Sequence, residues 1–281
     1  MNIYIVYPIA GLVGLIVGSF LNVVISRLPV MVGSEFPAEE DESENTDLNF
    51  NLWVPRSRCE SCLTPILYRD LIPVLSWVLL KGKCRNCSTR ISWRYPTVEI
   101  LSCLFAILLV GHFEVTVSTL CAAVCFALLI ALSTIDVERG LLLDELNYPL
   151  LWTGLLTSIW FQTSDVFPSP TEAIIGVVAG YLSFWLINFL FRMVRKKDGL
   201  GQGDFKLLAA TGAWVGWHLL PVVVLIAIAI GILFGLVRII QKQYSQDEGI
   251  PFGPFLAMGC IVAIVYREEL FLLLFRSSSF N

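Results

Sequence analysis

The sequence lacks three features that would point to other classes of protein. Acidic and basic residues nearly balance, with a formal net charge of −4 over 281 residues, so the charge does not suggest nucleic-acid binding. The eight cysteines are too few for a disulfide scaffold. No internal repeat is visible, so nothing favours a fold assembled from repeated units.

Hydrophobic residues, by contrast, are abundant. They make up 56% of the chain, and the mean hydropathy is +0.75, whereas soluble domains rarely exceed about half apolar residues. The excess lies in runs of about 15 to 22 residues, which are long enough to cross a bilayer. The sequence therefore predicts an all-α polytopic membrane protein with about eight transmembrane helices and one small loop domain.

Two of the eight predicted helices are short for a full span. These are the fourth and the sixth, which could be tilted or re-entrant. The sixth and seventh are separated near Gly216 to Pro221, because proline disrupts the hydrogen-bond ladder of a helix. The predicted segments are residues 3–26, 98–113, 116–134, 146–161, 172–192, 205–217, 219–239 and 253–274.

The first segment is expected to remain in the protein and not to be cleaved as a signal peptide. No basic residue precedes it, and it is too long for the apolar region of a signal peptide. Arg27 follows it where a cleavage site would have small residues. We therefore predict a permanent first helix.

Lysines and arginines are concentrated in alternate connections between the segments. Of the 19 in the chain, 17 lie in or beside these connections, and the opposite loops, such as residues 162–171, carry none. Because basic residues gather in cytoplasmic loops, the alternate connections are predicted to be cytoplasmic and the N-terminus to lie outside.

Residues 28–97 are the only sizeable polar part of the chain. They include an acidic stretch at residues 35–47, interpreted as a flexible solvated loop or, alternatively, as a surface that attracts a basic substrate segment. The predicted organisation is a first helix at residues 1–27, a cytoplasmic loop at 28–97 and a membrane core at 98–281.

Four cysteines of this loop form two CxxC pairs, Cys59 with Cys62 and Cys84 with Cys87. Two intervening residues let both sulfurs of a pair reach one ion, so the four thiolates can form a tetrahedral zinc site. A reducing cytoplasm argues against disulfides, although a redox CxxC remains an alternative. Four thiolates leave no open position on the metal, so the predicted zinc is structural.

Acidic residues are sparse after residue 100, and two lie at predicted cytoplasmic ends of helices. Asp136 ends the third segment and Asp204 opens the sixth. Ionisable groups at membrane depth are costly and indicate function. When two carboxylates lie close together, one is protonated while the other is charged, which is the state that an aspartic protease uses. The charged carboxylate would take a proton from water, and the protonated one would polarise the scissile carbonyl.

Other acidic residues compete for these roles. The residues alone do not separate Asp136 from Asp144, and Glu138 lies close to both in the sequence. Glu99, at the start of the second segment, is either a charge at a helix N-terminus or a functional group.

Three glycines precede Asp204, at Gly199, Gly201 and Gly203. Because glycine has no Cβ, an extended peptide could lie against this loop. The alternative is a flexible connection in which Asp204 caps the following helix. A dinucleotide-binding loop is disfavoured because no strand precedes the glycines.

Several blocks of the sequence resemble the bacterial prepilin peptidases, a family of membrane aspartic proteases. GSFLNVVISRLP is similar to the family's first-helix block, and the two CxxC motifs followed by WRYPTVEI are similar to its zinc-bearing loop. IDVERGLLLDELNYPLLWTGLL resembles the block of the first catalytic aspartate, and GLGQGDFKLLAATGAWVGW resembles the GxGD block. With PFGPFLAMG near the end, the resemblance extends from about residue 11 to about residue 260.

This resemblance implies a site and an activity. It implies that Asp136 and Asp204 are the catalytic pair and that Asp144 is only the second aspartate of its block. The family commonly has Leu-Pro-Asp where this chain has Leu142, Leu143 and Asp144. The implied substrates are type IV prepilins and type II secretion pseudopilins, which would be cleaved at the cytoplasmic face of the inner membrane. The new N-terminus would then be methylated with S-adenosylmethionine.

Two alternative functions remain open at this point. One is a peptidase without methyltransferase activity, in which the cysteine loop is purely structural. The other is a transporter that uses the two aspartates for protons or cations. Both aspartates lie at one predicted boundary instead of near the midplane, and no inverted repeat is visible, which disfavours transport.

Overall fold

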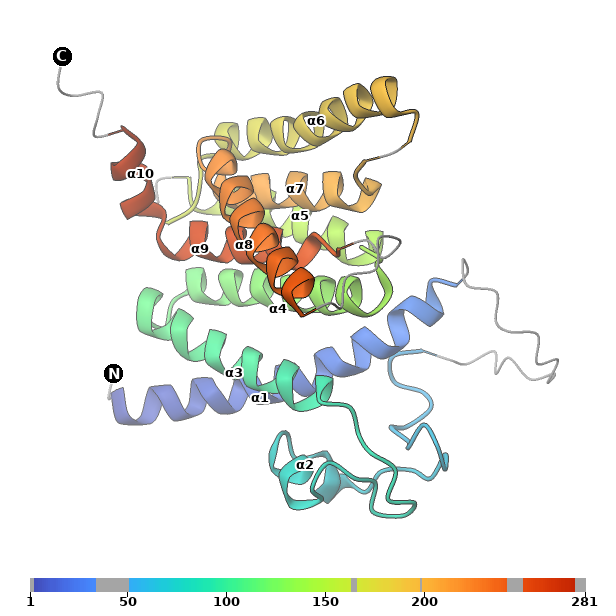
Figure 1. Cartoon of the computed structure of the whole chain (residues 1–281). Coiled ribbons are helices and arrows are strands. Elements are labelled where there is room, and N and C mark those ends of the chain that lie inside the picture. The colour runs from blue at the N-terminus through green and yellow to red at the C-terminus, as the bar shows by residue number, and fades with distance from the viewer. Residues whose placement is uncertain (1–2, 34–50, 163–165, 198, 242–249, 276–281) are drawn as a thin grey trace. The chain divides into compact units, whose positions relative to one another are not determined.

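The computed structural model of the chain describes residues 3–33, 51–162, 166–197, 199–241 and 250–275. This part of the chain is helical, with a single 3-10 turn, η1, and two isolated β-bridges but no strand. Figure 1 shows the helices. Their bounds are α1 Ile3–Met31, η1 Tyr68–Leu71, α2 Leu75–Leu79, α3 Arg94–Phe113, α4 Val117–Arg139, α5 Asp144–Trp160, α6 Pro170–Arg195, α7 Gln202–Val215, α8 Leu220–Ile240, α9 Gly253–Val265 and α10 Arg267–Phe275.

The helices confirm the prediction of an all-α membrane protein. Five of those described, α1, α3, α4, α6 and α8, are long and apolar enough to cross a membrane. α5 and α7 occupy the fourth and sixth predicted segments and have 17 and 14 residues, so both are short, as expected.

The prediction of one helix over residues 253–274 is wrong. α9 ends at Val265 and α10 begins at Arg267, so the segment is broken at Tyr266. The Arg267 side chain donates a 2.8 Å hydrogen bond to the carbonyl of Val215 at the end of α7. This polar contact explains why the apolar run does not continue as one helix.

The chain forms two compact units, Met1–Thr119 and Leu120–Asn281. In the first unit, α1 and α3 lie side by side (Figure 1). A Cβ on Gly14 of α1 would come within 2.6 Å of the carbonyl oxygen of Ser102, and one on Gly18 within 2.6 Å of the Cα of Glu99. Small residues let membrane helices approach closely, so this pair depends on both glycines.

Glu99 connects the loop of the first unit to α3. Its side chain is buried, and its Oε2 accepts a 2.7 Å hydrogen bond from the N–H of Val74. Val74 has a φ of 59° and lies in a tight turn in which the N–H of Leu75 bonds to the carbonyl of Pro73. Glu99 is thus an acceptor that holds this strained turn, and this contact tests neither of the two interpretations made from the sequence.

α7 lies at the centre of the second unit, in contact with α5, α6, α8 and α9. Every residue from 207 to 215 is buried. Gly176 of α6 faces Gly212 of α7 so closely that a Cβ on either would collide with the backbone of the other helix. On the α5 side, the indole N–H of Trp214 donates a 2.8 Å hydrogen bond to the carbonyl of Leu150. α7 is therefore held rigidly by its neighbours.

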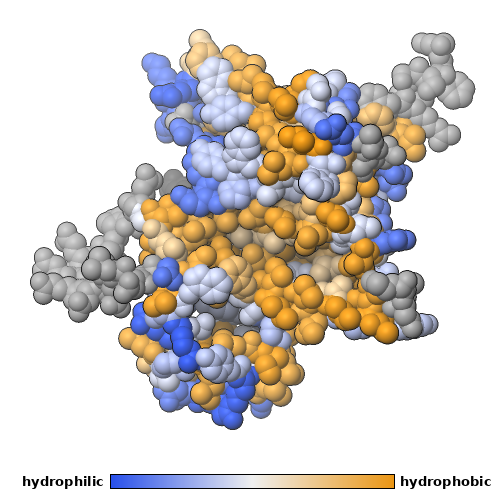
Figure 2. All heavy atoms as spheres, turned by 180° about the vertical axis from the view of Figure 1, so that it is seen from behind, coloured by the Kyte–Doolittle hydropathy of each residue, from blue (hydrophilic) through white to orange (hydrophobic). Residues whose placement is uncertain are grey.

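Many large apolar side chains remain exposed, as expected for a protein surrounded by lipid. On α6, Ile174, Val178 and Leu182 are 57%, 51% and 50% exposed. Figure 2 shows hydrophobic residues over much of the face that it presents. The acidic stretch at residues 35–47 lies outside the described residues, so both of its interpretations remain predictions.

Candidate active site

Asp136 lies in the last turn of α4, where its side chain is buried. Its Oδ2 accepts a 2.9 Å hydrogen bond from the main-chain N–H of Gly253, the first residue of α9. The first N–H groups of a helix have no partner within it. The carboxylate of Asp136 therefore satisfies one of these donors and fixes the start of α9 against the end of α4.

Asp204 lies in the first turn of α7, ahead of the apolar part of that helix. Burial raises the pKa of Asp204 to about 6, and the negative charge of Asp136 contributes to the same shift. Two carboxylates that repel each other in this way do not ionise independently. The structure thus brings together the two aspartates singled out in the sequence.

Two glycines, Gly253 and Gly203, allow the segments around the two aspartates to pack closely. A Cβ on Gly253 would lie 2.7 Å from Oδ2 of Asp136 and 3.0 Å from the Leu142 side chain. A Cβ on Gly203 would lie 2.6 Å from the Cβ of Leu142. Leu142, on the turn between α4 and α5, therefore fills a space that exists only because both positions are glycine.

Asp144 has a different environment. It lies at the start of α5, and both of its carboxylate oxygens bind the ammonium of Lys206, at 2.6 and 2.7 Å. This ion pair raises the pKa of Lys206 and compensates the charge of Asp144. Glu138 is exposed on α4. Asp136 differs from Asp144 and Glu138 because its charge contributes to the raised pKa of Asp204.

The glycine-containing loop before Asp204 is held by a side chain of α6. Oδ1 of Asn188 accepts hydrogen bonds from the N–H groups of Gly199 and Leu200, at 2.8 and 3.2 Å. These bonds show that the loop has a defined attachment to α6. They weaken the interpretation of this loop as a flexible connection.

The arrangement can perform acid–base chemistry on water. One carboxylate is fixed by a main-chain donor, and the other has a pKa raised to about 6, so it keeps its proton at pH values where an ordinary aspartate has lost it. Together they can accept a proton from water and donate one to an acceptor, which is the requirement for hydrolysis by an aspartate pair.

The four cysteines of the first unit form a candidate metal centre. Their sulfur atoms all lie within 4.8 Å of one another, and the sulfurs of Cys59 and Cys87 are 3.7 Å apart. A tetrahedral zinc with Zn–S bonds of about 2.3 Å requires sulfurs about 3.8 Å apart. Cys59, Cys62, Cys84 and Cys87 therefore fit the predicted zinc site in number, type and spacing.

The two CxxC pairs adopt the same turn. The N–H of Cys59 bonds to the carbonyl of Thr64, and the N–H of Cys84 bonds to the carbonyl of Thr89. Hydrogen bonds from Thr64 and then Asn86 lower the pKa of the Cys62 thiol to about 6, which favours the thiolate that a metal binds. In each turn the residue after the second cysteine has a positive φ: Leu63 and Ser88.

Comparison with known proteins assigns the chain to a family. A model of the bacterial peptidase A24 N-terminal domain matches residues 12–113, and a model of the type IV leader peptidase family matches residues 123–236. The chain is 41% identical over 271 residues to a prepilin leader peptidase/N-methyltransferase of Aeromonas salmonicida (strain A449), covering 94% of this chain and 92% of the relative. The chain belongs to the type IV leader peptidase family.

Other relatives of the type IV leader peptidase family agree with this assignment. Proteins with the same name from Burkholderia pseudomallei (strain 1026b) and Stutzerimonas stutzeri are 42% and 39% identical. The alignments cover 94% and 93% of this chain, and 87% and 91% of the relatives. No solved structure matches the chain.

The sequence analysis did not identify two residues of the candidate site, Gly253 and Asn188. Gly253 belongs to the PFGP block, but its N–H bond to Asp136 joins positions 117 residues apart. Asn188 lies within an apolar helix, where a lone amide is a signal for a polar contact, yet its partners could not be deduced from spacing. Both contacts depend on tertiary packing.

Proposed function

We propose that the chain is a bifunctional enzyme that removes the leader peptide from type IV prepilins and N-methylates the new N-terminal residue. The observation that supports it most directly is the pair formed by Asp136, bound to the N–H of Gly253, and Asp204, whose pKa responds to the charge of Asp136. Membership of the type IV leader peptidase family supports peptide hydrolysis as the reaction proposed for this pair.

In the proposed cleavage step, Asp136 is the charged member and Asp204 the protonated one. Oδ2 of Asp136 already accepts an N–H, so its other oxygen is available to take a proton from water. Asp204 donates a hydrogen bond to the scissile carbonyl, and its proton later helps to convert the amine into a leaving group. The resulting products are the leader with a new carboxylate and the mature pilin with a new amine.

The methyltransferase half of the proposal is supported by the names of the relatives. S-adenosylmethionine, when bound, supplies the methyl group. We assign no residue of this chain to its binding, so a peptidase without this second activity is the alternative against which the proposal is tested.

The four-cysteine centre is proposed to hold one structural zinc. The sulfur spacing supports this role, and a site of four thiolates has no position left for a substrate. The loop that carries the cysteines contains short helices and turns with few buried side chains. Metal binding would therefore supply much of its folding free energy.

The enzyme is proposed to lie in the bacterial inner membrane with its N-terminus outside and its aspartates at the cytoplasmic face. The distribution of basic residues supports this orientation. A reporter fused after Ser169 should be periplasmic, and one fused after Lys197 should be cytoplasmic. The opposite result would place the aspartates at the wrong face for a cytoplasmic substrate.

Mass spectrometry of a co-expressed prepilin tests both activities at once. Loss of the leader together with a gain of one CH₂ on the N-terminal residue supports the bifunctional proposal. Cleavage without the added CH₂ supports the peptidase-only alternative, and an intact prepilin contradicts both. Repeating the measurement with a type II secretion pseudopilin determines whether such precursors are also substrates.

A further inference from the structure

The short helix α2, in the loop of the first unit, carries its apolar side chains on the outside. Leu75, Val78 and Leu79 follow one side of the helix and are 50%, 57% and 71% exposed. Ser76 is instead buried, and its hydroxyl donates a 3.0 Å hydrogen bond to the carbonyl of Arg69. A helix on a water-soluble domain has the opposite arrangement, with its apolar side toward the core. The outer face of α2 is therefore unsuited to water.

Three large aromatic side chains of the same loop are also exposed: Trp53, Tyr68 and Trp93. The ring of Trp53 lies 6.0 Å from that of Phe20 on α1, and the ring of Trp93 lies 4.2 Å from that of Trp77 on α2. Tryptophan and tyrosine gather where a protein crosses the headgroup region of a membrane. These aromatic side chains thus indicate a membrane interface around α2 and the adjoining part of α1.

A hydrogen bond from the turn before α2 fixes the position of this helix along α1 and α3. The N–H of Val74 donates this 2.7 Å bond to Glu99, which lies in the second turn of α3. Glu99 packs against Gly18 of α1, on which a Cβ would come within 2.6 Å of the Cα of Glu99. From Gly18, α1 continues to Met31, which is roughly 20 Å of helix. α2 is therefore held beside the two spans and not beyond their ends.

The length of α1 relates this position to the layers of a bilayer. α1 has 29 residues, whereas the hydrocarbon core needs about 20. The part of α1 beyond about its first 20 residues therefore reaches the headgroup layer. Gly18 lies shortly before this limit, so the turn that Glu99 holds is close to the boundary between acyl chains and headgroups.

Basic side chains surround the apolar face of α2. Apart from the cysteines, residues 51–97 carry eight lysines and arginines and only two acidic side chains. One of these two, Asp70, is already paired with Arg85 at 2.7 Å. Lys81 and Lys83 follow α2, are exposed, and form no ion pair within the described part of the chain. Positive charge beside an apolar face is complementary to anionic phospholipids.

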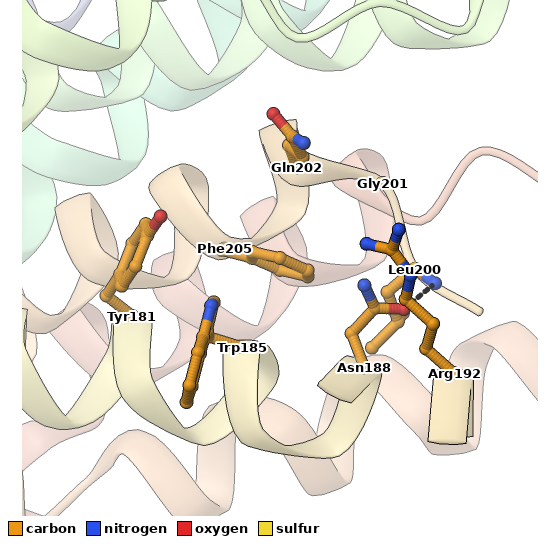
Figure 3. A pocket seen from close by; sticks show the side chains of 8 residues that line it. All are labelled: Tyr181, Trp185, Asn188, Arg192, Leu200, Gly201, Gln202 and Phe205. Carbon is orange, nitrogen blue, oxygen red and sulfur yellow. Dashed lines mark hydrogen bonds between the residues drawn. The ribbon is translucent and has the colours of Figure 1, made fainter. Parts of the chain in front are cut away.

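A bilayer surface accounts for these features better than a pocket or a polar partner does. The cavity in Figure 3 is lined by eight side chains of residues 181–205, all in the second unit, so it does not explain the exposed face of α2. A purely polar partner would leave the apolar side chains uncovered. A bilayer surface supplies both acyl chains and charged headgroups, at the level where α2 is held.

We propose that α2 is an interfacial helix that binds the bilayer surface, with its outer face among the acyl chains and Lys81 and Lys83 at anionic phospholipid headgroups. Apolar burial and attraction to headgroups act together in such helices. This contact attaches the four-cysteine loop to the membrane at a point other than its two ends. The proposal uses only the membrane location of the chain and is independent of the proposed peptidase activity.

The test places a fluorophore, carried by an unnatural amino acid, at position 79 of the full chain in nanodiscs. One set of nanodiscs contains phosphatidylcholine alone, and the other also contains phosphatidylglycerol. Lipids with a nitroxide on the acyl chain should quench this label, as they should a label at Leu182, which is exposed on α6. Aqueous iodide should quench the label at position 79 several-fold less than a label at Lys197, which is exposed after α6.

Two double variants separate the apolar and the charged parts of the contact. Leu75→Ser with Val78→Ser should increase iodide quenching at position 79 in both kinds of nanodisc. Lys81→Glu with Lys83→Glu should do so only with phosphatidylglycerol, by lowering the equilibrium constant for membrane contact at least about 5-fold for each lysine. Because all four side chains are exposed, the melting temperatures in detergent should match wild type.

Three results would overturn the proposal. The first is a wild-type label at position 79 that iodide reaches as readily as the label at Lys197. The second is a label shielded from iodide but not quenched by the nitroxide lipids, because protein and not lipid would then cover the face. The third is an equal effect of the lysine variant in both kinds of nanodisc, which would exclude anionic headgroups as the partner.

Discussion

The four cysteines lie on two short turns with little buried surface around them, whereas Asp136 and Asp204 lie at the ends of helices that pack closely against others. The cysteine turns are formed by local hydrogen bonds within six residues of chain. The aspartate site is formed by contacts between segments up to 117 residues apart. We therefore expect the first region to depend on a bound metal for its stability, and the second to depend on precise helix packing.

This difference predicts that the two regions respond to different perturbations. Removing metal should unfold the cysteine loop and leave the helices of the second unit intact, because all four proposed ligands belong to the first unit. Adding a methyl group between closely packed segments should disturb the aspartate site and leave the metal centre intact. The following predictions test this separation.

The largest effect is expected from Asp136→Asn and Asp204→Asn. Asparagine keeps the shape of aspartate but neither takes a proton from water nor shares one with its partner. Each change should lower cleavage by at least the factor of about 10² to 10⁴ that a positioned acid or base contributes, and the double variant should be little worse than either single one. Cleavage of a purified prepilin measures the loss, and zinc content should stay unchanged.

Asp144→Asn is the matched control for this comparison. Asp144 is 38% exposed and paired with Lys206, so its loss removes a solvent-screened ion pair worth about 1 kcal/mol or less. Activity should remain within a few-fold of wild type. An inactive Asp144→Asn beside an active Asp136→Asn would show that the wrong aspartate was assigned.

The second effect in size concerns the glycines around Leu142. In Gly253→Ala the new Cβ would lie 2.7 Å from Oδ2 of Asp136, and in Gly203→Ala it would lie 2.6 Å from Leu142. The segments must separate, and a displacement of about 1 Å in an active site costs on the order of 10²-fold in rate. We expect such losses of kcat with bound zinc unchanged. Gly235→Ala, whose Cβ would make an ordinary 3.6 Å contact with Ile250, should cleave normally.

The third effect is expected at the metal centre, with the second unit left intact. Cys84→Ser should abolish stoichiometric zinc binding and make the loop between α1 and α3 sensitive to protease, while the helices of the second unit stay protected. Elemental analysis and limited proteolysis measure both changes, with Cys121→Ser as a control outside the metal centre. Wild-type protein prepared without chelator should contain one zinc per chain. Metal-free wild-type protein would contradict the zinc assignment.

The smallest effect concerns pH. Asp204 has a pKa near 6 in the folded protein against an ordinary value of 3.8, so the folded state holds a proton that the unfolded state has lost. Its contribution to stability is therefore present below about pH 4 and decreases as the pH rises to about 6, by at most about 3 kcal/mol. The melting temperature of wild-type protein should fall across this window relative to Asp204→Asn.

The pH dependence of the melting temperature can also be measured in Asp136→Asn. It removes the charge that contributes to the Asp204 shift but leaves the larger contribution of burial. The pH-dependent loss should therefore become smaller without disappearing. An unchanged pH dependence in Asp136→Asn would mean that the two carboxylates are not electrostatically coupled.

Most of the fold could be predicted because apolar runs determine where helices form in a membrane. All eight predicted segments contain a helix, and α7 and α8 separate at residues 216–219, close to Pro221, as expected. The break at Tyr266 was missed. The charged residues from Arg267 to Glu269 were visible in the sequence, but the hydrogen bond from Arg267 to Val215 that holds the break was not.

The site could be predicted only in part. The cysteine centre followed from spacing, since its ligands are close in sequence within each pair. Asp136 and Asp144 are eight residues apart in one block, and their difference depends on Lys206 and Gly253, which lie in distant segments. Only the resemblance to a family separated them before the contacts were known.

The bond from Gly253 to Asp136 has a consequence for how this site tolerates mutation. A donor that belongs to the main chain is present whichever amino acid occupies the position, with proline as the one exception. An amino-acid substitution at position 253 can therefore displace the N–H group from Asp136, but only proline removes the group. Gly253→Pro would remove the donor itself. Comparing its effect on cleavage with that of Gly253→Ala would distinguish the loss of the hydrogen bond from the crowding that any added side chain causes.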